Sequence, residues 1–274
     1  EQGRTFTTCC RNRPGKGCPA FTGEACWQLR LEPGMLDKVV QLAYILEPKG
    51  AYSHPRLLAR ILMAIAVGEG KTTGRPDAGS AGGGFPGVSI VEVGVHEGLF
   101  AEALLETLEM LTLPVRQYTL VDRWAEMPSS LYDEQGEGTG IEHAARLAKA
   151  TARLAQRWPS KVRFLQVESA TAARWLSNDG EKADLVFIDA RHDYDSVWDD
   201  LQAWWPVVRE GGLFAGDDYE IARSDVVGVK RAVDEFAWAL GLSEQLVAPI
   251  RRCWLLPKAE DSPAPQRPAW LRLL

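Results

Sequence analysis

The chain has 274 residues, of which 46% are hydrophobic and 25% are charged, a balance typical of a globular protein with a sizeable core. Its net charge of −6 leaves no basic surplus to neutralise phosphates, so we expect no nucleic-acid partner. No apolar run reaches the length of a membrane span, and the length allows one large domain or two small ones.

Residues 1–33 form a segment rich in Gly, Pro, Arg and Cys, without a hydrophobic period. Because the first residue is Glu1, we expect a processed or truncated product that has lost any targeting segment. Four of the five cysteines lie here, without the C-x-x-C pairs of a zinc site: Cys9, Cys10, Cys18 and Cys26. One or two disulfides would stabilise a segment with no core of its own and indicate the secretory-pathway lumen. Free thiols and a cytoplasmic location are the alternative.

The elements expected next are two helices, at 35–49 and 55–67, where apolar residues recur three and four apart. A Gly-rich linker at 69–87 completes an N-terminal part that spans 34–87. From Val88 to residue 256, short apolar runs alternate with helical patterns, and 257–274 is a Pro-rich tail. The expected strands are 88–94, 115–122, 162–167, 184–189 and 212–216, and the expected helices are 97–111, 141–157, 169–177, 195–209 and 226–240. Cys253 is expected to be a buried thiol on a late strand.

This alternation indicates parallel strands joined by crossover helices. The sequence therefore predicts an α/β fold, with a Rossmann-like, doubly wound, mostly parallel sheet and helices on both faces. Ligands bind such a sheet at the carboxyl ends of its strands. The residues that follow each strand are consequently the first candidates for a functional site.

The first three strands end in residues that suit a nucleoside. Glu92 and Gly94 end the first strand and Gly98 begins the next helix, a spacing that differs from the G-x-G-x-x-G of pyrophosphate sites. Asp122 ends the second strand, where an acid accepts hydrogen bonds from both hydroxyls of a ribose. Ser169 is expected to be a helix N-cap that also contacts the base. Packing glycines and a solvated acid are the alternative.

The next two strands end in carboxylates, Asp189 after the fourth and Asp217 and Asp218 after the fifth. Adjacent parallel strands bring these acids to one edge, where uncompensated charges raise pKa values and cost stability. Oxygen ligands without Cys or a His pair favour Mg²⁺, Mn²⁺ or Ca²⁺ over zinc. The alternative is a capped turn. We interpret three further acids as a helix N-terminus stabilised by its dipole: Asp195, Asp199 and Asp200.

The segments "VEVGVHEGLFAEALLE", "TLVDRW" and "FIDARHDYDSVWDDLQAWWPVVREGGLFAGDDY" resemble class I S-adenosylmethionine-dependent methyltransferases. Within that class they are most similar to the metal-dependent macrolide-sugar O-methyltransferases and the uncharacterised proteins grouped with them. The resemblance covers roughly 55–256 and implies a methyltransferase domain at 88–256. Arg191 departs from the family block, which has a second acid there ("IDADH"), so no role is carried over for that acid. The implied donor-binding residues are Glu92, Gly94, Gly98, Asp122, Arg123, Ser169 and Asp189, and the implied ligands of Mg²⁺ or Mn²⁺ are Asp189, Asp217 and Asp218.

The chemistry that this resemblance implies is methyl transfer to a hydroxyl. A metal lowers the pKa of a hydroxyl and orients two neighbouring oxygens, which suits a sugar diol or a catechol. His192 and Asp189 are both candidate bases, and a structural His192 is the alternative. Tyr52, Ser53 and His54 are candidates for closing over the pocket.

We therefore expect an O-methyltransferase with a small-molecule or glycan acceptor, a glycan if the cysteines are oxidised. A catechol-like acceptor and a non-catalytic binding module on the same fold stay open as alternatives. A nicotinamide dehydrogenase is disfavoured, because the third glycine and the diphosphate loop are missing. The oligomeric state stays open, a homo-oligomer included.

Overall fold

The computed structural model describes residues 53–68, 85–126, 140–220, 227–250, 252–258 and 263–265. The expected helix at 35–49, the expected disulfides and most of the linker and the tail lie outside these residues. No described helix is both long and apolar enough to cross a membrane.

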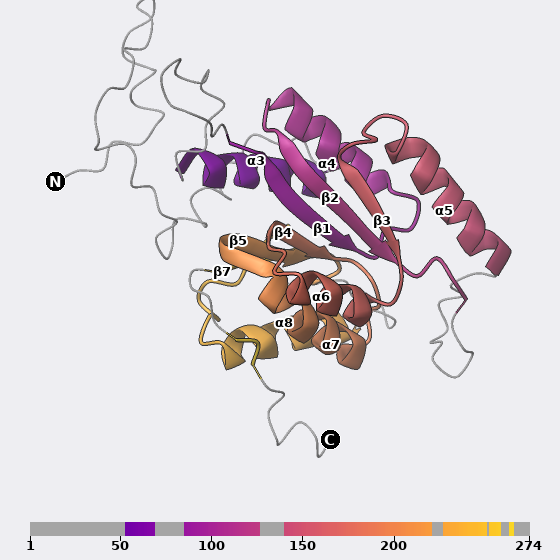
Figure 1. Cartoon of the computed structure of the whole chain (residues 1–274). Coiled ribbons are helices and arrows are strands. Elements are labelled where there is room, and N and C mark those ends of the chain that lie inside the picture. The colour runs from indigo at the N-terminus through magenta and orange to yellow at the C-terminus, as the bar shows by residue number, and fades with distance from the viewer. Residues whose placement is uncertain are drawn as a thin grey trace, which may run out of the picture.

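The described strands form one seven-stranded sheet in the order β3-β2-β1-β4-β5-β7-β6 (Figure 1). The first five strands along the chain pair in parallel, whereas β7 runs antiparallel between β5 and β6. The strand order reverses between β1 and β4, which makes their carboxyl ends the expected ligand site. The strands are β1 (Val88–Val93), β2 (Val115–Asp122), β3 (Val162–Gln166), β4 (Ala183–Ile188), β5 (Val208–Gly216), β6 (Val247–Ile250) and β7 (Cys253–Lys258).

Helices cover both faces of this sheet (Figure 1). One face packs against α3 (Ser53–Gly68), α4 (Leu99–Met110) and α5 (Gly140–Leu154), and the other against α6 (Ser169–Asn178), α7 (Tyr194–Trp204) and α8 (Val227–Ala239). All six residues of β1 and of β4 are buried, because both faces of each strand are covered. The predicted fold class is therefore confirmed.

Tryptophans fill much of the core beneath α6, α7 and α8. Trp198, Trp204, Trp205 and Trp254 are each at most 1% exposed and pack with Phe214 and Phe236. The core on the opposite face includes apolar residues of α3 next to those of α4 and α5. Helix α3 therefore belongs to the same folded unit as the sheet, although the sequence assigned it to a separate N-terminal part.

Most boundaries shift by one to three residues, and three differences affect the description of the fold. The predicted helix 195–209 ends at Trp204 and continues as a short 3₁₀ turn, Trp205–Val207, with Pro206 in its first turn. Strand β5 starts at Val208, four residues earlier than expected, although two glycines interrupt its apolar pattern. The late strand expected at Cys253 is confirmed as β7, where this cysteine is a buried free thiol. This strand extends to the fully buried Lys258, past the expected boundary at 256.

Candidate functional site

A cavity of about 520 Å³ lies at the carboxyl ends of β1 to β4. Its lining comes from the segments that follow these strands and from α5 and α7. Two of the predicted donor-binding residues, Glu92 and Gly98, are not part of this lining. The predicted residues that do line it are Gly94, Asp122, Arg123, Ser169, Asp189 and His192.

Gly94 allows the ends of β1 and β4 to touch. Its φ is +87°, and a Cβ at this position would lie 2.0 Å from the carbonyl oxygen of Asp189. The amide of Asp189 in turn donates to the carbonyl of Val93 at 2.8 Å. Glycine is thus required for a backbone contact, whether or not a ligand is bound. Gly98, with φ +75°, packs against Leu154 of α5 rather than against the cavity.

Asp122 organises the turn that follows β1. Its Oδ2 accepts hydrogen bonds from the amides of Val95 at 2.9 Å and His96 at 3.0 Å. Its Oδ1 accepts one from the amide of Trp124 at 2.8 Å. A carboxylate offers about four lone-pair sites, so about one is left for a ligand. The expectation that Asp122 alone binds both hydroxyls of a ribose does not fit this geometry.

Glu92 is a buried residue of β1. It is 1% exposed, and its Oε2 accepts a hydrogen bond from the hydroxyl of Tyr118 at 2.7 Å. Burial raises the pKa of Glu92 well above its usual range. Glu92 therefore does not line the cavity, although Asp189 and Asp122 are close enough to contribute to its raised pKa.

Ser169 is the first residue of α6, and the N-cap is Glu168, so the predicted capping role is wrong. The Ser169 hydroxyl instead donates to the carboxylate of Asp200 and accepts from Trp204 Nε1 at 2.8 Å. Its neighbour Glu168 forms an ion pair at 2.9 Å with Arg123, which ties the segments after β2 and β3 together at the cavity.

Asp200 is not the dipole-stabilised surface acid that we expected. Helix α7 starts at Tyr194, so Asp200 lies in its middle, on the face that packs against α6. It is 7% exposed, and burial raises its pKa from about 3.9 to about 7. Asp193 is the N-cap of α7 and accepts a hydrogen bond from the amide of Ser196 at 3.0 Å. Asp195 lies in the first turn of α7, as expected, whereas Asp199 is exposed but lies beyond that turn, so the expectation was wrong for it as well.

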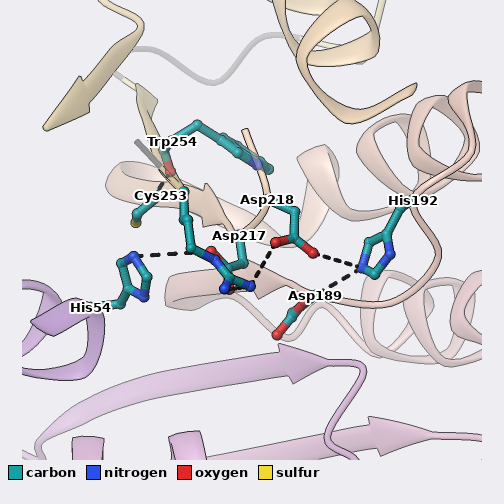
Figure 2. A network of polar contacts seen from close by, with 8 residues as sticks. His54, Asp189, His192, Asp217, Asp218, Cys253 and Trp254 are labelled. Carbon is teal, nitrogen blue, oxygen red and sulfur yellow. Dashed lines mark hydrogen bonds and ion pairs between the residues drawn. The ribbon is translucent and has the colours of Figure 1, made fainter. Parts of the chain in front are cut away.

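Asp189, His192 and Asp218 form a cluster beside the cavity, shown in Figure 2 and called the edge trio below. His192 Nε2 lies 3.1 Å from Asp218 Oδ2 and 3.8 Å from Asp189 Oδ1. One potential ligand atom from each residue lies within 4.8 Å of the other two. The neighbouring carboxylates, Asp189 first, raise the pKa of His192, whereas burial raises the pKa of Asp218.

Asp217 points away from the edge trio, although we expected it to be a third metal ligand. Its Oδ1 lies 4.0 Å from Nε2 of His54, which α3 brings to this edge (Figure 2). The guanidinium of Arg252, from the turn between β6 and β7, lies 3.3 Å from Asp217 Oδ2 and 2.7 Å from Asp218 Oδ1. Arg252 therefore balances part of the negative charge that the sequence analysis assigned wholly to a cation.

Several cavity residues were not identified from the sequence. They are His96, His143 and Arg146, of which the last two lie on α5. His143 is 7% exposed, and its Nε2 is buried without a hydrogen-bond partner among the described residues. The available signal was a histidine on the apolar face of an amphipathic helix, which more often indicates packing than binding.

Comparison with known proteins gives one family. The model of a methyltransferase-domain family matches residues 91–219, which include β1 to β5 and most of the cavity lining. No curated protein matches the chain.

The chain also resembles solved structures at low identity. The O-methyltransferase NovP is 18% identical over 76% of this chain and 79% of its own, with a TM-score of 0.49. The calicheamicin methyltransferase CalS11 is 15% identical over 84% and 94%, with a TM-score of 0.48. A putative O-methyltransferase from Klebsiella pneumoniae is 16% identical over 82% and 90%, with a TM-score of 0.47. Similarity at this level says nothing about the substrate.

Proposed function

We propose that the chain is a class I S-adenosylmethionine-dependent methyltransferase that transfers the methyl group to a hydroxyl of a sugar or glycan, assisted by a divalent cation. One observation carries this proposal. Asp189 and His192 line the cavity and also belong to the edge trio with Asp218. A donor held in this cavity would therefore lie directly adjacent to groups that can activate an acceptor hydroxyl.

The edge trio fits a divalent cation of the Mg²⁺ or Mn²⁺ type. It offers two carboxylates and one imidazole nitrogen, and His192 Nε2 is buried without a well-formed hydrogen bond to any residue that the structure describes. The two carboxylates suit Mg²⁺ or Mn²⁺, whereas the imidazole is a ligand more typical of transition metals than of Mg²⁺. Arg252 is half-exposed, so its guanidinium can withdraw to solvent when a cation takes over the charge of Asp217 and Asp218. A cation held here supplies a lowered hydroxyl pKa and a template for neighbouring oxygens.

The reaction also requires a base that accepts the proton of the acceptor hydroxyl. In methyl transfer the acceptor oxygen bonds to the methyl carbon as the carbon–sulfur bond breaks, and the electron pair stays on sulfur. The hydroxyl proton then passes to a base, for which His192 and Asp189 are the candidates that line the cavity. The same Nε2 lone pair of His192 cannot bind a cation and accept the proton, so these two roles exclude one another.

An acceptor screen tests the proposal. The protein is incubated with methyl-labelled S-adenosylmethionine and a panel of sugars, oligosaccharides and catechols, and products are identified by mass spectrometry. We expect label on one hydroxyl of a sugar or glycan, lost on chelation and restored by Mg²⁺ or Mn²⁺. Label on catechols alone supports the alternative acceptor. Donor binding without any methyl transfer supports a non-catalytic binding module.

A further inference from the structure

His143 is a buried polar group on the wall of the cavity, and its Nε2 lacks a hydrogen-bond partner in the described part of the chain. Its side chain lies on α5 and is 7% exposed, and Nε2 makes no hydrogen bond to any described residue. Most buried polar atoms in folded proteins are hydrogen-bonded, and leaving one unpaired is costly. Because His143 is one of the residues that line the cavity, a ligand held there is a candidate for the partner that Nε2 lacks.

His143 and Asp122 both line the cavity and are linked through Arg146 and His96. Arg146 lies one turn further along α5 on the same face, and after burial its charge is the main cause of the lowered pKa of His96. The amide of His96 in turn donates to Asp122 Oδ2 at 3.0 Å. All four residues line the same cavity. This face of α5 therefore borders the turn that Asp122 organises.

The hydrogen-bond capacity of Asp122 is the second observation. Three backbone amides occupy its carboxylate, which leaves about one lone pair. A ribose presents two neighbouring hydroxyls. A second protein group is therefore needed to hydrogen-bond the second ribose hydroxyl. An imidazole nitrogen can do so in either tautomer, because a hydroxyl both donates and accepts hydrogen bonds.

We propose that His143 is a donor-binding residue whose Nε2 hydrogen-bonds one ribose hydroxyl of S-adenosylmethionine, while Asp122 accepts the other hydroxyl with its remaining lone pair. This inference rests on the donor assigned under the proposed function. It is independent of the cation and of the acceptor. It adds α5, which precedes β3, to the strand-end segments that hold the donor.

Calorimetry with S-adenosylhomocysteine tests the inference, because this product carries the same ribose and is not consumed. The ligands are S-adenosylhomocysteine and its 2′-deoxy and 3′-deoxy analogues. The proteins are the wild type, His143→Ala, His143→Gln and Thr151→Ala, an exposed position on the same helix. We expect His143→Ala to weaken S-adenosylhomocysteine binding about tenfold, as for the loss of one hydrogen bond. One deoxy analogue should bind His143→Ala and the wild type equally, His143→Gln should recover part of the affinity, and Thr151→Ala should change nothing.

Two outcomes overturn the inference. Equal losses for all three ligands would show that His143 shapes the cavity without contacting the ribose, and unchanged affinity would show that it contacts no part of the donor. Melting temperatures without ligand identify a folding defect, since a histidine needed only for packing lowers the stability of the free protein when replaced. If wild-type protein fails to bind S-adenosylhomocysteine, the donor assignment and this inference both fail. If it binds but methylates no acceptor, only the proposed transfer reaction fails.

Discussion

His192 Nε2 lies 3.1 Å from Asp218 Oδ2, although the two residues come from segments that follow different strands, β4 and β5. This contact places an imidazole at the carboxylate edge of the sheet, where the sequence analysis expected ligands with oxygen atoms only.

Replacing His192 distinguishes its two proposed roles. If His192 is the base, His192→Ala lowers kcat by about 10²- to 10⁴-fold while the affinity for Mn²⁺ stays within a few-fold. If it is a ligand, Mn²⁺ affinity falls together with kcat. Mn²⁺ titration by calorimetry and turnover on the same preparations separate the two cases. An unchanged kcat with unchanged Mn²⁺ affinity would assign His192 a structural role and leave Asp189 as the remaining candidate base.

Asp218 and Asp217 are expected to differ, because only Asp218 belongs to the edge trio. Asp218→Asn should weaken Mn²⁺ binding more than about tenfold, whereas Asp217→Asn, next to His54, should weaken it less. Both variants should bind S-adenosylhomocysteine as the wild type does, since neither residue lines the cavity to which we assign the donor. Equal losses of Mn²⁺ affinity would show that Asp217 turns toward the cation when it binds.

Gly94→Ala should lower the free energy of unfolding. Any loss of donor binding in this variant would therefore not by itself show a contact with the donor. Its Cβ would meet the backbone of Asp189 at 2.0 Å, in addition to the cost of a positive φ. Gly180→Ala is the matched control, because φ is +70° there and nothing lies within 4 Å of the new Cβ. We expect Gly180→Ala to cost about 1–2 kcal/mol in unfolding free energy and Gly94→Ala clearly more. Similar losses in denaturant unfolding would contradict the close contact between β1 and β4.

Asp200 should make stability depend on pH. Its pKa is about 7 in the folded protein and about 3.9 when unfolded, so the folded state holds the proton more tightly in between. Stability therefore falls as pH rises from about 4 to about 7, by at most about 1.4 kcal/mol per pH unit. Asp200→Asn removes this loss and should gain stability relative to the wild type across that window. Asp195→Asn, exposed in the first turn of the same helix, is the control, and parallel profiles for all three proteins in urea unfolding would contradict the buried carboxyl.

The N-terminal cysteines decide the proposed lumenal location. If Cys9, Cys10, Cys18 and Cys26 form disulfides, non-reducing mass spectrometry will show missing hydrogen masses that a reductant restores. Cys253 provides an internal reference, because burial raises its thiol pKa and limits alkylation of the folded protein. Complete alkylation of all four N-terminal thiols without reductant would support the cytoplasmic alternative.

The sequence by itself determined the described helices and the five parallel strands, and it located the strand-end residues. Hydrophobic period is a local property, so β1, β4 and α4 can be recognised from their own residues. The carboxyl ends of parallel strands meet at one edge in any doubly wound sheet, so Asp122, Asp189 and Asp218 could be assigned to one site before any contact was known.

Only the tertiary structure decided which contacts each of these residues makes. The β6–β7 hairpin brings Arg252 against Asp217 and Asp218, and that contact depends on residues distant in sequence. Whether Asp200 faces solvent or the interior depends on how α7 packs against α6. His143 shows the same limit, since a helical period places it on the apolar face of α5 but does not reveal that this face borders a cavity. Side-chain identity and spacing specify what each segment can bind, whereas the packing of segments distant in sequence determines which groups are left without a protein partner.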